Sequence, residues 1–216
     1  MKTEPRRPAT LYADDWLLVL EKPAGLLCVP GRGPDKQDCL SARAQAQYPD
    51  ALVVHRLDMA TSGLLLMARG KPAQQVLSRA FATRQVGKTY QALVHGRLAP
   101  APDGWGVIDL PITLDWPERP RRVVRPEGGK PSVTRWRVMA PLGETYTRVE
   151  LEPLTGRSHQ LRVHLQAIGH PILGDSLYGP GDVPDDAPRL MLHATQLVFA
   201  HPATGQALHF TSAPEF

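Results

Sequence analysis

The sequence predicts an α+β fold, in which a mixed, largely antiparallel sheet carries flanking helices and loops. Segments with strand character outnumber those with helical periodicity, and the two kinds do not alternate as they do in doubly wound parallel proteins. No internal repeat, low-complexity tract or linker divides the 216 residues. We therefore expect one domain spanning residues 1–216, and leave open that a long twisted sheet folds into two halves.

The N-terminal third predicts a hairpin, a short helix and a central strand. Leu11-Tyr12 and Trp16–Leu20 read as the hairpin, and Lys22-Pro23-Ala24-Gly25 then ends the strand because proline cannot continue the ladder. Asp38–Gln47 is compatible with a short helix. Leu64–Ala68 is apolar at every position, which is typical of a strand buried on both faces.

A helix and a strand follow. The helix KPAQQVLSRAFATR has Pro72 in its first turn and an apolar stripe with helical spacing, made by Ala73, Val76, Leu77, Ala80 and Phe81. The strand GKTYQALVHG comes next and directs Tyr90, Ala92 and Val94 to one face.

The C-terminal half predicts four more strands and a second helix. The strands are Val133–Met139, Thr145–Leu151, Met191–Phe199 and Ala207–Phe210, and the last two flank a hairpin turn at HPATG. The helix lies in SHQLRVHLQAIGHP, where Ser158 can cap, Gly169 and Pro171 stop it, and the stripe is Leu161, Leu165 and Ile168.

Composition indicates an ordinary globular protein of the cytoplasm. Apolar residues make up 42% and charged residues 21% of the chain, and no apolar run reaches the length of a membrane helix. The N-terminus, MKTEPRRPAT, lacks the apolar centre of a secretory signal. Cys28 and Cys39 form neither a metal spacing nor a disulfide framework, so both are expected to be reduced, inert thiols. No membrane partner is expected, and a monomer is the default.

Several familiar chemistries lack their residues. His159 and His164 are five apart, whereas two helical metal ligands need a spacing of three or four, so we expect no metal. GRGPDK has neither the Walker spacing nor a following apolar helix, and GxGxxG is absent, which disfavours a nucleotide cofactor. Ser62, in ATSGL, does not form a nucleophile elbow.

The segment VVHRLDMATSGLLLMAR places His55, Arg56 and Asp58 between two apolar runs, with a predicted turn at Thr61-Ser62-Gly63. Asp58 has apolar neighbours and is expected to be partly buried, which is costly for a carboxylate without a partner. One interpretation is a structural ion pair with Arg56, Arg157 or Arg162. The other is a nucleophile or general base that an arginine holds ionised.

Two further features allow a structural or a functional interpretation. Arg157 opens the second helix, where helix electrostatics favour acids, so it either caps a loop carbonyl or reaches for a specific carboxylate or phosphate. Tyr90, close after Lys88, is either a core aromatic or a platform on which a nucleic-acid base stacks.

A basic segment, WPERPRRVVRPEGGKP, looks like an exposed loop or hairpin. A net charge of +4 is compatible with an acidic partner. The cations of the segment either form a solvated face or contact phosphates; they are Arg119, Arg121, Arg122, Arg125 and Lys130.

Together, HRLDMATSG, GKTYQALV and LEPLTGRSHQLRVHL resemble the signature motifs of the RluA family of pseudouridine synthases. The likeness extends to LVLEKPAGLLCVP and IGHPILGDSLYG and covers nearly the whole chain. Within this family, the chain most resembles the branch that modifies uridine 32 of a tRNA anticodon stem-loop and uridine 746 of 23S rRNA. This finer resemblance rests on three segments, DLPITLDWPERPRRVV, GKPSVTRW and PRLMLHATQLVFAHPATG. That branch lacks the N-terminal S4 domain of many relatives, and we expect none here. Ala60 departs from the motif at a loosely specified position.

The resemblance implies a cofactor-free isomerisation of uridine in RNA, with no DNA partner. By this resemblance Asp58 is the catalytic aspartate, Arg157 pairs with it, and Tyr90 packs on the uracil. Arg56 fills the space that the flipped base leaves, and His55 helps to position it. A uridine in a stem-loop must be flipped out to reach a partly buried carboxylate, and flipping needs cations along the RNA phosphates. These contacts are expected from Lys88, Arg162 and the basic segment.

Other functions remain open from the sequence. A non-catalytic RNA-binding module would keep Asp58 only as an ion-pair partner. A carboxylate-dependent glycosidic hydrolase would need a second acid, for which Asp175 is the candidate. A pseudouridine synthase with a different rRNA or tRNA target is the third alternative.

Overall fold

The computed structural model describes residues 8–180 and 187–216. The chain divides into two compact units: unit 1 holds Met1–Lys88 and Ala194–Glu215, and unit 2 holds Thr89–His193 and Phe216. The single-domain expectation stays a prediction. The N-terminal segment MKTEPRRPAT, which is not expected to be a secretory signal, lies mostly outside the described residues.

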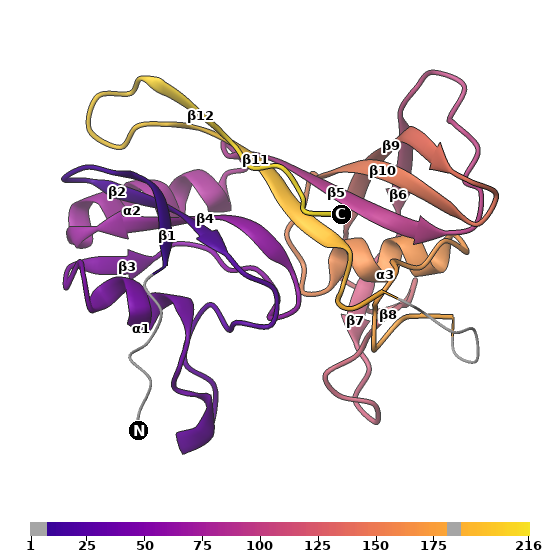
Figure 1. The fold of residues 1–216 in the computed structure, drawn as a ribbon, viewed down its shortest axis with the longest axis horizontal. Coiled ribbons are helices and arrows are strands. Elements are labelled where there is room, and N and C mark those ends of the chain that lie inside the picture. Colours follow the sequence, from indigo (N-terminus) through magenta and orange to yellow (C-terminus); the bar gives the residue numbers. More distant parts are fainter. Residues whose placement is uncertain (1–7, 181–186) are drawn as a thin grey trace. The chain divides into compact units, whose positions relative to one another are not determined.

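Strands dominate the described chain, as predicted (Figure 1). The strands are β1 (Ala9–Ala13), β2 (Leu17–Lys22), β3 (Ala51–Val53), β4 (Ser62–Arg69), β5 (Gly87–His95), β6 (Gly106–Asp109), β7 (Ile112–Leu114), β8 (Arg122–Val124), β9 (Val133–Leu142), β10 (Tyr146–Pro153), β11 (Leu192–Ala200) and β12 (Ala207–Thr211). The helices are α1 (Leu40–Gln45), α2 (Gly70–Ala82), α3 (Gln160–Ala167) and the 3-10 turn η1 (Pro34–Lys36).

In unit 1 the strand order is β1-β2-β4-β11, with β12 paired to β11 and β3 paired to β4. The β1–β2, β2–β4, β3–β4 and β11–β12 pairings are antiparallel. The predicted central strand is β4, whose residues Leu64–Ala68 are fully buried. One face of β4 packs with α2 and with β11 residues Leu197 and Phe199 in an apolar core. Burial of this kind is the main favourable term in folding.

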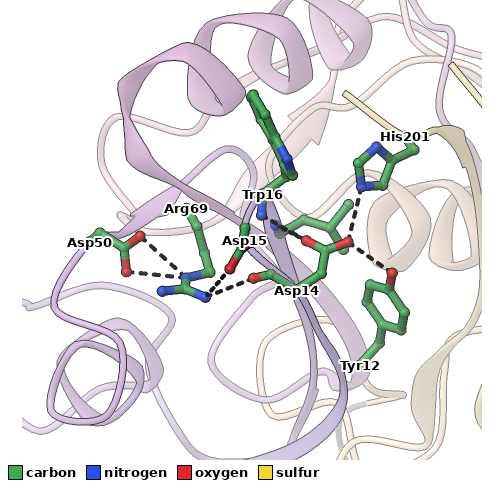
Figure 2. A network of polar contacts seen from close by, with 8 residues as sticks. Tyr12, Asp14, Asp15, Trp16, Asp50, Arg69 and His201 are labelled. Atoms are coloured by element: carbon green, nitrogen blue, oxygen red, sulfur yellow. Dashed lines mark hydrogen bonds and ion pairs between the residues drawn. The ribbon is translucent and has the colours of Figure 1, made fainter. Parts of the chain in front are cut away.

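A polar network joins two hairpins of unit 1 (Figure 2). Asp14 lies in the β1–β2 turn, and its Oδ1 accepts hydrogen bonds from the backbone N–H groups of Trp16 (2.7 Å) and Leu17 (2.8 Å). Its Oδ2 accepts from the hydroxyl of Tyr12 (2.8 Å) and from Nε2 of His201 (2.9 Å), which follows β11. Partial burial opposes ionisation of Asp14, but these hydrogen bonds together hold its pKa below the usual range.

In unit 2 the order is β5-β10-β9-β6, with antiparallel β5–β10, β9–β10 and β6–β9 pairings, and β7 pairs with β8 separately. The short α3 lies against β8, β9 and β10 (Figure 1). Strands β5 and β11 each begin in one unit and end in the other. The predicted α+β class, with its mostly antiparallel sheet, is confirmed.

Three local predictions need correction. Ser158 does not cap the second helix: the residue before it is His159, which makes no side-chain capping bond. Val76 is 48% exposed, because it lies about 60° around the helix from Ala73, on the side away from Leu77. Gly63 belongs to β4 and not to a turn.

The turn expected at Gly63 closes earlier, where the N–H of Thr61 donates to the carbonyl of Asp58 (3.1 Å). Gly63 has φ +107°, and a Cβ there would lie 2.4 Å from the carbonyl oxygen of Ala194. The glycine therefore allows β4 to approach β11 closely.

Candidate active site

Asp58 is the first residue of the turn between β3 and β4, a position that aspartate favours. Its side chain is partly buried, as expected, between buried Leu57 (7% exposed) and Met59 (52% exposed). The carboxylate lies close enough to Lys22 and Cys28 to influence both electrostatically. Sequence reasoning treated Lys22 only as part of a strand end and Cys28 as an inert thiol.

His55 is an anchor for this turn and not an accessible base. Its Nε2 accepts a hydrogen bond from the backbone N–H of Leu66 in β4 (2.9 Å), so the ring proton sits on Nδ1. The ring stacks on Phe81 of α2 with centroids 4.3 Å apart. Burial, with a smaller effect of the Lys88 ammonium, lowers the pKa of His55 to about 3, and the ring is neutral at pH 7.

Lys88 and Arg56 differ in their exposure. Lys88 is half-buried, and its burial, together with the charge of Arg84, lowers its pKa. Arg56 is exposed and lies between the anchored His55 and buried Leu57. Such a side chain is attached to a fixed backbone while its guanidinium stays in solvent, which suits contact with an external anion or base.

Tyr90 and Arg157 lie in unit 2 and are described there. Tyr90 is half-buried on β5, opposite Leu151 of β10, and shares its face with fully buried Ala92 and Val94, as predicted. Arg157 is exposed in the turn that precedes α3, and its Nε donates to the carbonyl of Pro131 (3.3 Å). Its pairing with Asp58 stays a prediction.

The turn that carries Arg157 is fixed by Gln160, the first residue of α3. Gln160 is 4% exposed, and its Oε1 accepts from the backbone N–H of Arg157 (3.0 Å) and the hydroxyl of Thr155 (2.7 Å). Its Nε2 donates to the carbonyl of Val133 (3.0 Å) in β9. This side chain fixes the turn before α3 but does not cap the helix, because the N–H that it accepts belongs to Arg157, upstream of α3.

Arg162 is buried and bound to Asp175. Its Nε and Nη2 donate to the two carboxylate oxygens at 2.7 and 2.6 Å, and the side chains are 5% and 0% exposed. The backbone N–H groups of Leu177 and Tyr178 also donate to Asp175. The second acid of a hydrolase is therefore fully engaged in a structural pair. The RNA contact predicted for Arg162 stays a prediction; within unit 2 the guanidinium is engaged by the buried carboxylate of Asp175.

The basic segment, residues 116–131, holds the loop between β7 and β8, strand β8 and the stretch after it, as expected for a loop or hairpin. Arg119, Arg125 and Lys130 are exposed, and Arg121 and Arg122 are half-buried. Arg119 stacks over the indole of Trp116 (3.9 Å to the centroid), which is 64% exposed. An exposed aromatic ring beside several cations is typical of surfaces that bind single-stranded nucleic acid.

The described residues offer neither a metal site nor a membrane-spanning helix. Across 8–180 and 187–216, no group of three or more His, Cys, Asp or Glu side chains could hold a metal ion. Within the same ranges, no helix is both long enough and apolar enough to cross a membrane.

Known proteins resemble this chain over nearly its whole length. Residues 16–167 match the family model described as RNA pseudouridylate synthase. The proteins named dual-specificity RNA pseudouridine synthase RluA from Escherichia coli K12 and Yersinia pestis are 47% and 48% identical over 206 residues. These alignments cover 95% of this chain and 93% and 98% of the two relatives.

Solved structures agree with this match. Human RNA pseudouridylate synthase domain containing 1 superposes with a TM-score of 0.80 at 30% identity, covering 100% of this chain and 87% of that one. The human domain containing 4 protein gives a TM-score of 0.75 at 29% identity, covering 95% and 88%. The chain belongs to the RNA pseudouridylate synthase family, the enzymes that isomerise uridine in RNA to pseudouridine.

Proposed function

We propose that this enzyme modifies two RNA classes, converting uridine 32 of a tRNA anticodon stem-loop and uridine 746 of 23S rRNA. The observation that supports this most is the 47–48% identity to dual-specificity enzymes over more than nine tenths of both chains. Those RNAs belong to the cytoplasm, where we also place the protein, acting as a monomer.

In the proposed reaction the bond between N1 of uracil and C1′ of ribose breaks. The uracil turns over, a bond forms between C5 and C1′, C5 gives up its proton, and N1 takes one up, so that the product is an isomer of uridine. Asp58 either adds covalently to the nucleotide or assists formation of a glycal-like intermediate. The partial burial of Asp58 supports this role, because a carboxylate shielded from water interacts more strongly with the reacting sugar.

The other proposed roles follow the family motifs. Tyr90 packs on the uracil, Arg157 pairs with Asp58, and Arg56 occupies the space left by the flipped base. The exposure of Arg56 and the half-buried position of Tyr90 are compatible with these roles. His55 acts by anchoring the backbone of the turn to β4.

RNA binding is proposed to extend to the basic segment. Its cations contact phosphates, and the Trp116–Arg119 stack offers a surface for an unpaired base. Phosphate contacts position the RNA without reading its sequence. Lys88 is proposed to contact the backbone close to the reacting nucleotide.

The test of the proposed function is pseudouridine formation by wild type, Asp58→Asn and Asp38→Asn. The substrates are the tRNA stem-loop, the 23S hairpin and a control hairpin with its uridine at another position. Asp38 is an exposed aspartate paired with Arg43, so its variant controls for loss of a carboxylate. We expect Asp58→Asn to abolish conversion of both RNAs while binding is kept, and Asp38→Asn to remain active. Full activity of Asp58→Asn contradicts its role, and equal activity on the control hairpin contradicts the targets.

Tyr90→Phe separates two roles of Tyr90, stacking of its ring on the uracil and participation of its hydroxyl in removing the C5 proton. The ring still stacks, so we expect binding to be kept and turnover to fall if the hydroxyl helps to remove the C5 proton. Equal turnover of the variant and the wild type means that the hydroxyl has no part in the chemistry.

A further inference from the structure

Tyr178 is a buried residue that connects strand β8 to the turn preceding α3. Only 2% of it is exposed. Its hydroxyl oxygen accepts a hydrogen bond from the backbone N–H of Arg122 (2.7 Å) and lies 2.8 Å from Nδ1 of His159. The backbone N–H of Tyr178 donates to the buried carboxylate of Asp175 (3.1 Å). The first residue of β8 is therefore tied to the rest of unit 2 through one side chain.

The backbone of Arg121 and Arg122 is fixed where the loop enters β8. The N–H of Arg121 donates to the carbonyl of Glu118 (2.9 Å), and its carbonyl accepts from the N–H of Asp115 (3.1 Å). Arg122 follows with its bond to the hydroxyl of Tyr178. Both arginine side chains therefore extend from an ordered backbone, so that less entropy is lost when they bind a ligand.

The side chains of these two arginines lack acceptors within the protein. Both are half-buried, and across residues 8–180 and 187–216 neither forms an ion pair. Their Nε atoms are buried, and neither has a hydrogen-bond partner in the described part of the chain. A buried donor without an acceptor costs free energy, and so does a shielded charge without a counter-charge. The two guanidinium groups are therefore suited to an anion from outside the protein.

Arg162 shows the contrasting arrangement beside the same aromatic ring. Its guanidinium carbon lies 5.0 Å from the ring centroid of Tyr178, and the guanidinium carbon of Arg121 lies 5.8 Å from it. Asp175 neutralises Arg162 through two hydrogen bonds of 2.7 and 2.6 Å. Within the described ranges, no carboxylate does this for Arg121. One of the two arginines is thus neutralised inside unit 2, and the other keeps an uncompensated charge.

We propose that Arg121 and Arg122 form a subsite for one phosphodiester of the RNA backbone, and that Tyr178 positions them. A side-chain rotation that turns the Nε–Nη2 edge of a guanidinium outward gives that edge two parallel hydrogen bonds to phosphate oxygens. The three exposed cations of the basic segment act instead through a field that salt screens. This inference rests on the proposed function, in which the tRNA stem-loop is a substrate.

The test is a scan of the tRNA stem-loop in which one phosphate at a time is replaced by an uncharged methylphosphonate. The Kd of each RNA is measured for wild type, for the double variant Arg121→Gln, Arg122→Gln and for Tyr178→Phe, together with each protein's unfolding midpoint. Arg97→Gln is the control, because Arg97 is a 62% exposed cation of unit 2 that pairs with a carboxylate outside the basic segment.

We expect one backbone position at which the methylphosphonate weakens binding to wild type about 10-fold, because a bidentate contact is lost there. The double variant should bind the unmodified RNA about 10-fold more weakly and lose less than about 2-fold more at that position. In Tyr178→Phe the loss at that position should shrink to about 3-fold, since the backbone of Arg122 is no longer held. Arg97→Gln should stay within about 2-fold of wild type. Arg125→Gln, an exposed cation of the same segment, should leave the 10-fold loss at that position unchanged.

A double variant that binds the unmodified RNA within about 2-fold of wild type overturns the subsite. A scan in which no position depends on the two arginines also overturns it. The full loss at that position in folded Tyr178→Phe refutes positioning by Tyr178, and if that variant does not fold, the arginine variants decide alone. A wild type that neither binds nor converts the stem-loop refutes the proposed function, whereas conversion by wild type beside unchanged binding by the double variant refutes only the subsite.

Discussion

Replacing Asp175 by asparagine tests whether the buried pair of Arg162 and Asp175 stabilises unit 2. The substitution keeps the side-chain shape but turns one acceptor oxygen into an NH2 group that faces the guanidinium, 2.6–2.7 Å away. Arg162 cannot lose its charge, and it is only 5% exposed. Removing one partner of such a buried pair costs about 3–5 kcal/mol. We therefore expect the free energy of unfolding to fall by about that amount.

The measurement is urea unfolding, in which the free energies of unfolding of the two proteins are compared at the same dependence on urea concentration (the m-value). Glu144→Gln is the control. Glu144 accepts from Nη1 of Arg97 at 2.9 Å, a distance close to that of the buried pair, but these two side chains are 83% and 62% exposed. The control should lose less than about 1 kcal/mol, since solvent screens exposed pairs. An Asp175→Asn protein as stable as the control refutes the buried pair. Arg162 would then be available to RNA, and Arg162→Met should lower the salt dependence of binding by about one phosphate contact.

Four other predictions concern stability and RNA binding. Gly63→Ala should cost at least about 2 kcal/mol in thermal or urea unfolding, because its Cβ would collide with the Ala194 carbonyl at 2.4 Å; a neutral effect refutes the close approach. Asp14→Ala should lose about 2–3 kcal/mol at pH 7, because it removes the four hydrogen bonds that the Asp14 carboxylate accepts (Figure 2). Since the pKa of Asp14 is lowered, this advantage of wild type should disappear as pH falls through that lowered value, and an advantage that persists at the acid end contradicts the assignment. His55 has its pKa lowered to about 3, so the unfolded chain binds its proton first and wild-type stability should fall from about pH 6.5 downward, more steeply than in His55→Gln. Trp116→Ala should weaken RNA binding by about 1–3 kcal/mol without slowing turnover at saturating RNA, and unchanged affinity removes the indole from the RNA surface.

Periodic patterns made most of the fold predictable. Leu64–Ala68 is apolar throughout and is the buried strand β4, and the GKTYQALVHG alternation is β5. The strands β6, β7 and β8 were not predicted, because each has only three or four residues in a region rich in proline. Their pairing partners, and not their own sequences, determine that they are extended.

The site was predictable where a motif identifies it and not where tertiary contacts do. HRLD indicated the turn with Asp58, but the turn closes at Thr61 and not at Gly63, since Gly63 is needed opposite Ala194. Lys22 has the composition of an exposed strand end. Its burial depends on the carbonyls of Pro23 and Leu26, which follow it closely, and of distant Met59, and no local pattern reports that last contact.

The three polar residues of the HRLD motif have different structural roles. His55 is neutral and fixes the turn to β4, Arg56 stays exposed, and Asp58 is partly buried. The anchors come from different parts of the chain: one hydrogen bond from β4 reaches His55, the thiol of Cys28 reaches Leu57, and Lys22 reaches the residue after Asp58. Losing one anchor leaves the others in place, so each single variant should loosen Asp58 only partly. Because contacts to one rigid turn are coupled, removing two anchors should cost more turnover than the product of the single effects.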